Sequence, residues 1–239
     1  MRAVIFAGPS LPPSARPASA QFEWHPPVRQ GELYRVALER PAIIGVVDGY
    51  FEVTPTVWHK EILFAMAQGI HVFGAASIGA LRAVELDAFG MRGIGSIYQD
   101  FRDGVLEDDD EVAVLHGPAE LGYPPVTEAM VNIRATLADA ARDGIVSPFV
   151  ASQLTATAKA LFYKERTYRA VLDAAASELG SAELQQFADW LPTGRVDQKR
   201  RDALAMLDAV AAHIGAGTAP LRVNYELADT AAWQAVRRG

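Results

Sequence analysis

One serine, Ser77, lies where a side-chain hydroxyl would be presented for chemistry. It belongs to HVFGAASIGALRAVEL, residues 71–86, in which a short apolar run ends at Gly74 and a helix-like pattern follows. Small residues stand two positions on either side of it, Ala75 and Gly79, as in a nucleophile elbow, whose sharp strand-to-helix turn exposes the hydroxyl. Ala75 replaces the first glycine of the G-x-S-x-G pattern. The alternative interpretation is that Ser77 only caps the helix.

Two backbone N–H groups near this serine are candidates for binding a developing oxyanion. The turn would aim the N–H of Ile78 and the positive end of the helix at that oxygen. Asp48 and Gly49 follow an apolar run at residues 42–47, whose end we expect at the same edge of the sheet, so the Gly49 N–H is a candidate second donor. An ordinary turn explains Asp48 and Gly49 equally well.

A serine nucleophile needs a base, and Lys60 is the lysine whose surroundings fit this role best. None of the five histidines has a recognisable triad context in the sequence. Lys60 lies in a helical pattern, and its neighbours at three and four residues include Leu63 and Phe64 but no acid. A lysine acts as a base only where its surroundings disfavour its charge, so we expect its amine within hydrogen-bond reach of Ser77, directly or through one water. The alternative is a lysine whose stem covers the core while its amine reaches solvent.

The other charged positions are interpreted mainly as structural or solvated. Arg82 has two interpretations, an i,i+3 pair with Glu85 or a contact with the substrate. Lys199 stands three residues before Asp202, and we expect a solvated pair. The run EDDDE, residues 107–111, predicts a solvated acidic loop, because consecutive carboxylates splay apart and make a poor divalent-metal site. The glycines of GMRGIG are a weak phosphate cradle, and no metal or cofactor is expected.

Composition limits the class of protein. The chain has 239 residues, of which 50% are hydrophobic and 21% charged, which is typical of a globular protein with one or two domains. A formal net charge of −7 argues against a general nucleic-acid binder. The chain has no cysteine, so sulfur chemistry would have to use sulfur held by another molecule. With no signal-peptide pattern and no apolar window of about 18 residues, we expect a cytoplasmic protein without a membrane segment.

The order of expected elements indicates an α/β fold with a mostly parallel sheet and flanking helices, plus a C-terminal all-helical region. Strands are predicted at residues 2–8, 42–47 and 70–74, with 111–117 as a further candidate. Thr54 and Pro55 predict the start of a helix that runs to Gly69. Later helices are predicted by apolar spacing at residues 125–142, 148–178, 181–190 and 196–214. We therefore expect an α/β core at residues 1–120 and a helical region at 121–239 packed on it.

Several segments, in this order, resemble the TfuA-like proteins, the companions of YcaO enzymes in peptide backbone thioamidation. VVDGYFEVTPTVWHKEIL, GIHVFGAASIGALRAVEL, FGMRGIG and GVLEDDDEVAVLHG carry the resemblance over about residues 42–117. It implies a Ser–Lys site, with Ser77 and Lys60 at the matching positions. It also implies a substrate, a ubiquitin-like sulfur-carrier protein of the ThiS type with a C-terminal thiocarboxylate, which is hydrolysed to release sulfide for the YcaO enzyme. A role in helping that enzyme engage its precursor peptide is implied as well.

The chemistry of the two residues agrees with this expectation. Attack by Ser77 on a thiocarboxylate carbonyl would give an acyl-enzyme and expel sulfide, while neutral Lys60 takes the serine proton and later activates water. The alternative function is a non-catalytic adaptor that bridges the sulfur carrier, the YcaO enzyme and the peptide, and a small-molecule hydrolase is a third. Arginine-rich segments at 141–147 and 194–201 suit either docking to an acidic partner or a solvated face.

Overall fold

The computed structural model describes residues 2–50, 54–217 and 219–238, which fold as two compact units. The first unit comprises Met1–Glu107 and Arg200–Gly239, and the second comprises Asp108–Lys199. The division expected at residue 120 therefore falls inside the second unit. The chain also returns to the first unit after residue 199, because a long C-terminal helix contributes core residues to the sheet.

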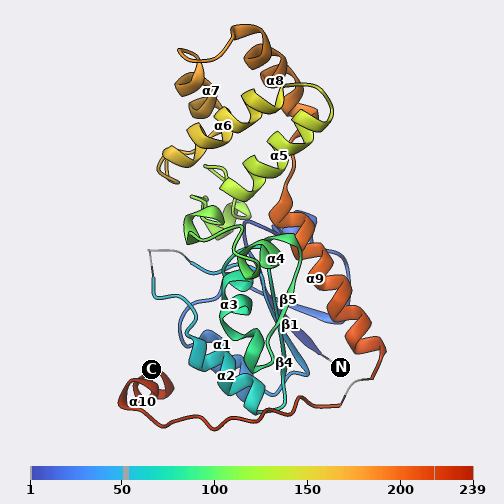
Figure 1. The fold of residues 1–239 in the computed structure, drawn as a ribbon. Helices are drawn as coiled ribbons and strands as arrows, with labels where there is room; N and C mark the ends of the chain where they lie inside the picture. The colour runs from blue at the N-terminus through green and yellow to red at the C-terminus, as the bar shows by residue number, and fades with distance from the viewer. Residues whose placement is uncertain (1, 51–53, 218, 239) are drawn as a thin grey trace. The chain divides into compact units, whose positions relative to one another are not determined.

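The first unit is built on a five-stranded, entirely parallel sheet (Figure 1), which confirms the predicted fold class. The strand order is β2-β1-β3-β4-β5, an order found in flavodoxin-like doubly wound sheets. The strands are β1 (Ala3–Phe6), β2 (Phe22–His25), β3 (Ile43–Val46), β4 (His71–Ala75) and β5 (Arg92–Ile94). Three of them lie where apolar runs predicted strands.

The two strands that the sequence did not predict are the edge strands, β2 and β5. The central strands β1 and β3 are buried at every position, so their sequences are continuous apolar runs. The edge strands are only partly buried and carry charged residues, Glu23 in β2 and Arg92 in β5. An edge strand has a neighbouring strand on one side only and is partly exposed to solvent, so its sequence need not be a continuous apolar run.

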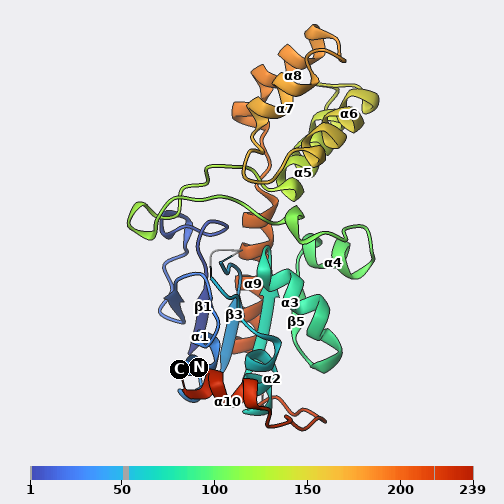
Figure 2. The same ribbon diagram turned by 90° about the vertical axis from the view of Figure 1, so that its left-hand side faces the viewer.

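Helices cover both faces of the sheet (Figures 1 and 2). One face packs against α1 (Glu32–Leu38), α2 (His59–Ala67) and α3 (Ile78–Leu86). The other face packs against α9 (Gln198–Gly215), with Ala203, Met206, Leu207 and Val210 buried on Ile5, Ile43 and Phe73. A β-carbon on Gly45 of β3 would lie 2.9 Å from the Met206 methyl carbon, so the missing side chain lets α9 approach the sheet closely.

The helix after β3 begins later than its sequence predicts. α2 starts at His59 rather than at Pro55, and the buried Glu61 carboxylate accepts the Trp58 N–H at 3.0 Å at this start. The same carboxylate accepts the N–H groups of Gly31 and Tyr34, which ties α2 to α1. The capping role predicted for Thr54 is wrong, because its hydroxyl is buried without a partner in the described part of the chain. Part of the loop before it, residues 51–53, lies outside the described residues.

The glycines of GMRGIG make room for side chains rather than for a phosphate. A β-carbon on Gly93 would lie 2.1 Å from the Tyr98 ring, and one on Gly95, whose φ is +96°, would lie 2.3 Å from the Asp202 carboxyl carbon. Asp202 accepts the Ile97 N–H at 2.8 Å and so closes the start of α4 (Ser96–Arg102). Asp202 is buried by this contact, so the expected solvated pair with Lys199 is wrong.

The second unit is helical, with α5 (Met130–Arg142), α6 (Pro148–Ala160), α7 (Tyr168–Ala175) and α8 (Ser181–Gly194) around an apolar core. The helix predicted over 148–178 is interrupted at residues 161–167. The strand predicted at 111–117 is also wrong, since η3 (Asp109–Glu111) is followed by irregular chain with one antiparallel bridge, His116 to Pro125. A further single turn, η4, spans Ala119–Leu121.

The acidic run of residues 107–111 is a solvated loop only in part, because residues 107–109 are exposed whereas Asp110 is half-buried and Glu111 is buried. The Lys159 amine lies 3.1 Å from the Asp108 carboxylate and 3.0 Å from that of Glu111, and it also contacts Asp110. The buried Arg166 guanidinium pairs with Asp110 at 2.6 Å. Burial opposes the charge of Asp110, yet hydrogen bonds from Lys159 and Arg166 lower its pKa overall. These ion pairs fasten η3 to α6 and to the segment after it.

The chain does not stay helical to its end. After α9, residues 219–230 form an extended arm without helix or strand, and α10 (Ala231–Arg238) follows (Figure 2). Within LRVNYELA, residues 221–228, every second side chain is half-buried: Leu221, Val223, Tyr225 and Leu227. This period of two is that of an extended chain with one face packed against the protein.

Candidate functional site

The turn between β4 and α3 has the sharpness that the elbow pattern predicts. Only Ala76 and Ser77 separate the last strand residue, Ala75, from the first helical residue, Ile78. Ala76 has φ of 66°, in the left-handed region that residues other than glycine seldom adopt. The Ser77 N–H donates to the Ala75 carbonyl at 2.7 Å, which tightens the reversal. Buried packing holds this strained turn, since Ala76 belongs to the core on the α9 face.

Two glycines bring the first turn of α3 against the backbone of the sheet. A β-carbon on Gly79 would lie 1.8 Å from the Val46 carbonyl oxygen, and one on Gly74 would lie 2.1 Å from the Gly79 carbonyl oxygen. The Gly79 N–H donates to the Val47 carbonyl at 3.3 Å. The small residue two positions after the serine is therefore required by close backbone approach, as in a nucleophile elbow.

The Ser77 hydroxyl does not cap α3. The residue occupies the N-cap position, but its side chain accepts no hydrogen bond from the helix. Its carbonyl instead accepts the N–H groups of Ala80 and Leu81. Within the ranges that the structure describes, the half-buried hydroxyl has no hydrogen-bond partner, so it is available to a substrate.

Gly49, the predicted second oxyanion donor, packs against Ile78, the residue that follows the serine. A β-carbon on Gly49 would lie 2.8 Å from the Ile78 methyl carbon Cγ2, so the end of β3 touches the start of α3. In the described part of the chain, neither the Gly49 N–H nor the Ile78 N–H has a hydrogen-bond acceptor. Two uncommitted backbone donors next to an uncommitted hydroxyl are the components from which an oxyanion hole is built.

Asp48, a predicted substrate-binding residue, has its carboxylate bound within the protein. One oxygen, Oδ2, accepts the N–H groups of Gly8 and Ser10 at 2.8 and 3.0 Å, and the other, Oδ1, accepts the Ser10 hydroxyl at 2.6 Å. The carboxylate is buried and joins the loop after β1 to the end of β3. The sheet order reverses between these two strands, where ligands of such sheets bind, so Asp48 shapes that edge. The sequence offered no signal for the contribution of Ser10.

Lys60 lies on the side of α2 that faces away from the core. The buried side of this helix carries Glu61, Ile62, Ala65 and Met66, whereas Lys60 is half-buried beside Leu63 and Phe64. The Lys60 amine donates to the Thr230 hydroxyl at 3.1 Å. Among the described residues it makes no hydrogen bond to Ser77, so the direct contact that we expected is not formed in this structure.

The contacts of α2 with α3 show where its first turn lies. The Arg82 guanidinium donates to the Val57 carbonyl at 3.1 Å, and His59 pairs with Glu85 at 2.9 Å. At 1.5 Å rise per residue, positions 82–85 are about 8–12 Å along α3 from Ser77. Arg82 also pairs with Glu85 at 2.6 Å, so the structure shows the structural pair, one of the two interpretations of this arginine.

Two hydroxyls without a recognisable motif in the sequence lie on the segment between β3 and α2. Thr54 Oγ1 and Thr56 Oγ1 are buried and have no hydrogen-bond partner in the described residues. Buried hydroxyls usually have a partner, so these two positions are unusual. The sequence TPT carries no pattern that separates such hydroxyls from ordinary loop residues.

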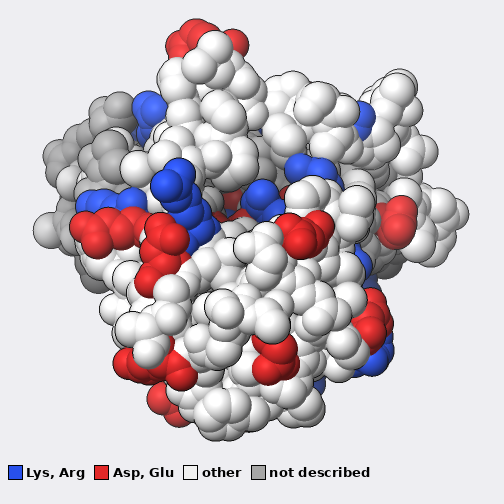
Figure 3. All heavy atoms as spheres, turned by 90° about the horizontal axis from the view of Figure 1, so that it is seen from above, with Lys and Arg blue, Asp and Glu red and all other residues white. Residues whose placement is uncertain are grey.

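Figure 3 shows one face, on which Lys/Arg and Asp/Glu side chains are interspersed among uncharged residues. In the described ranges no three His, Asp or Glu residues are grouped as a metal site would require. Nor does any helix in those ranges combine the length and the apolar character that crossing a membrane demands.

Comparison with known proteins identifies the family. A search of curated proteins finds no match to this chain. The sequence model of the family described as TfuA-like protein matches residues 48–167, which is 120 of the 239 residues. The matched part contains Gly49, Lys60, Ser77, Ile78 and Arg82 and includes segments of both units. The chain therefore belongs to the TfuA-like family, whose members are companions of YcaO enzymes in peptide thioamidation.

Proposed function

We propose that this chain hydrolyses the C-terminal thiocarboxylate of a ubiquitin-like sulfur-carrier protein of the ThiS type and so supplies sulfide to a YcaO enzyme. That enzyme would use the sulfide to thioamidate its precursor peptide. Family membership supports the thioamidation context. The observation that carries the hydrolase proposal is the β4–α3 turn, where the Ser77 hydroxyl does not cap its helix. Gly49 packs against Ile78 at this turn, and neither backbone N–H has an acceptor in the described part of the chain.

The proposed reaction has two halves. The Ser77 oxygen attacks the thiocarboxylate carbonyl, the C–S bond breaks, and the carrier becomes an ester of Ser77 while hydrosulfide leaves with the serine proton. Water then cleaves the ester, which regenerates the hydroxyl and gives the carrier a carboxylate. The Gly49 and Ile78 N–H groups would bind the oxyanion in both halves.

Lys60 is the proposed base of this reaction. As a neutral amine it would take the serine proton in the first half and pass it to the departing sulfur. In the second half it would take a proton from water and return it to the Ser77 oxygen. In the structure its amine is bound to Thr230, so this role requires Lys60 to leave Thr230 and approach Ser77. The proposal therefore includes a rearrangement of the segment that carries Lys60.

The proposal is tested with a purified thiocarboxylated carrier, by measuring released sulfide and the replacement of sulfur by oxygen in the carrier's mass. Ser77→Ala should abolish both signals while the chain stays folded. Ser96→Ala is the matched control, because Ser96 follows β5 at the same edge of the sheet. Rapid quenching of the wild-type reaction should trap the carrier as an ester on Ser77. Normal sulfide release by folded Ser77→Ala would disprove the hydrolase.

The second candidate function is a non-catalytic adaptor that joins the carrier, the YcaO enzyme and the peptide. The binding of the Lys60 amine to Thr230, on the outer side of α2, favours this candidate. Added sulfide separates the two functions. If the chain is a hydrolase, the YcaO enzyme should fail to thioamidate its peptide in the presence of Ser77→Ala, and free sulfide should restore the reaction. If the chain is an adaptor, thioamidation should proceed with Ser77→Ala without any added sulfide.

A further inference from the structure

The C-terminal arm covers the outer side of α2 along its whole length. The Leu221 N–H donates to the Gly69 carbonyl at 2.9 Å, just beyond the end of the helix. The Tyr225 hydroxyl donates to the Leu63 carbonyl at 2.8 Å, in the middle of α2. The Thr230 hydroxyl accepts a hydrogen bond from the Lys60 amine at the start of α2. The arm therefore runs antiparallel to α2, and its last contact is with the amine of Lys60.

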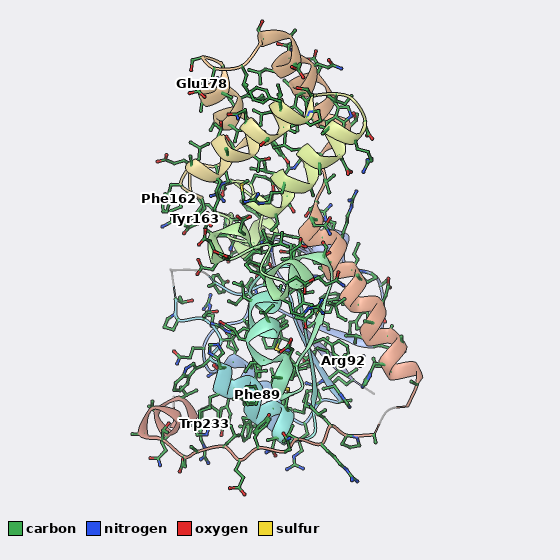
Figure 4. All side chains as sticks on the ribbon, viewed as in Figure 1. Phe89, Arg92, Phe162, Tyr163, Glu178 and Trp233 are labelled. Carbon is green, nitrogen blue, oxygen red and sulfur yellow. The ribbon has the colours of Figure 1, made fainter. Side chains whose placement is uncertain are left out.

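One aromatic residue anchors the end of the arm. Among the described side chains of α10, Trp233 is the buried one, and Figure 4 shows that it points from α10 toward α1 and α2. Its ring lies 5.2 Å from the Tyr34 ring and 5.7 Å from the Phe64 ring, measured between centroids. The Thr230 hydroxyl also accepts the Trp233 N–H at 3.3 Å, so the same hydroxyl caps α10 and binds Lys60.

The physical character of the arm is that of a segment able to detach. Residues 219–230 belong to no helix or strand, and their alternate side chains are exposed. A helix of the length of α10, eight residues, is marginal without tertiary contacts. Elements with few buried contacts open at a small free-energy cost, well below that of global unfolding. Loss of the Trp233 contact would therefore release the arm without unfolding the sheet.

We propose that residues 219–238 form a latch on α2. When the latch is closed, Thr230 holds the Lys60 amine on the outer side of the helix. When it opens, the outer side of α2 is uncovered and Lys60 is released to approach Ser77. This inference rests on the proposed function and adds a control to it, since the closed state is the inactive one.

The first test compares Trp233→Ala with the wild-type chain at full length. Two signals are measured, sulfide release from the thiocarboxylated carrier and the rate at which an acylating amine reagent modifies Lys60, followed by mass spectrometry against Lys164 as internal reference. We expect both signals to rise about tenfold or more, because losing a buried aromatic contact shifts the closed–open equilibrium by at least this factor. Arg237→Ala, on the exposed side of α10, is the matched control and should change neither signal.

A milder pair of variants guards against misfolding. Thr230→Val keeps the branched shape but removes the acceptor for Lys60, whereas Thr230→Ser keeps the acceptor. Modification of Lys60 should accelerate severalfold in Thr230→Val and stay unchanged in Thr230→Ser.

The outcomes separate failure of the latch from failure of the hydrolase. Unchanged modification of Lys60 in both Trp233→Ala and Thr230→Val would overturn the latch. So would faster modification without faster sulfide release, provided that Ser77→Ala is inactive. Wild-type sulfide release by Ser77→Ala would instead remove the hydrolase, and the modification rates alone would then show whether the arm covers Lys60.

Discussion

The carbonyl oxygen of Val46 lies 1.8 Å from the point where a β-carbon on Gly79 would stand. This single relationship locks the first turn of α3 onto the end of β3, and it brings Ile78 and Gly49 into contact beside Ser77. No backbone atom in that contact can give way as a flexible side chain would. The geometry of the candidate site thus depends on the absence of one methyl group.

Gly79→Ala should therefore destabilise the chain and distort the turn. Overpacking in a well-packed region costs about 1–3 kcal/mol, and a clash with backbone belongs at the upper end of that range. The midpoint of urea unfolding should fall accordingly. The control is Gly215→Ala in α9, where an added β-carbon meets no atom within 4 Å. That variant should be neutral or gain up to about 1 kcal/mol, since alanine favours a helix over glycine. Equal stabilities of the two variants would contradict the close approach.

Substitution of Lys60 tests whether it is a base or a positive anchor for the thiocarboxylate. Lys60→Arg keeps the charge, but a guanidinium does not lose its proton near neutral pH, so we expect this variant to be as inactive in sulfide release as Lys60→Ala. The double variant Ser77→Ala with Lys60→Ala should release sulfide hardly more slowly than either single variant. Removing one of two residues that act as a catalytic unit already removes the contribution of both. Normal turnover by Lys60→Arg would mean that another group takes the serine proton.

Arg166 should contribute strongly to the stability of the second unit. Its guanidinium is buried and donates to the carbonyls of Ala158 and Leu161 as well as to Asp110. Arg166→Met removes these three donated hydrogen bonds at a buried site, although Asp110 keeps its contact with Lys159, and should cost about 3–5 kcal/mol. Arg169→Met is the matched control, because among the described residues Arg169 forms only an exposed pair with Asp173, at 3.6 Å. It should change the free energy of unfolding by at most about 0.5 kcal/mol in denaturant titrations. Similar losses in both variants would contradict a special role for the buried arginine.

The pH dependence of stability should include a contribution from His213 of α9. Its Nδ1 accepts the Arg92 guanidinium at 3.0 Å, and its ring lies 4.2 Å from that of His71. Burial, followed by the charges of His71 and Arg92, lowers the pKa of His213 from its ordinary value of 6.5. A protonated His213 could no longer accept from Arg92. At this residue the unfolded chain therefore binds a proton more readily than the folded chain. The stability that neutral His213 contributes is fully present above pH 6.5 and is lost as the pH falls toward the lower pKa that His213 has in the folded chain.

Urea titrations between about pH 8 and pH 5 measure this effect. The wild-type chain should lose more stability toward acid than His213→Gln, which keeps a side-chain acceptor for Arg92 but does not titrate. His59→Gln is the control, since His59 faces the Glu85 carboxylate and not a guanidinium. Parallel pH profiles for the wild type and His213→Gln would show that this histidine does not titrate differently on folding.

Local sequence patterns were sufficient for the features that depend on neighbours along the chain. The runs that became β1, β3 and β4 are buried on both faces, so their apolar character alone predicts strands. The small residues around Ser77 predict a strand-to-helix turn, because only small side chains fit so sharp a reversal. Leu63 and Phe64 are indeed the neighbours of Lys60, since helical spacing sets which residues share a face.

Features that depend on distant partners were beyond any local pattern. The acidic run at residues 107–111 resembles a solvated loop until Lys159 and Arg166, about fifty residues later, neutralise it. The edge strands β2 and β5 need no apolar run, so charged residues conceal them. Lys60 is half-buried, and helical periodicity does not say whether its side of the helix meets the core or an arm 170 residues away. The sheet packs against the other face of α2, and so the arm that Trp233 of α10 anchors covers Lys60.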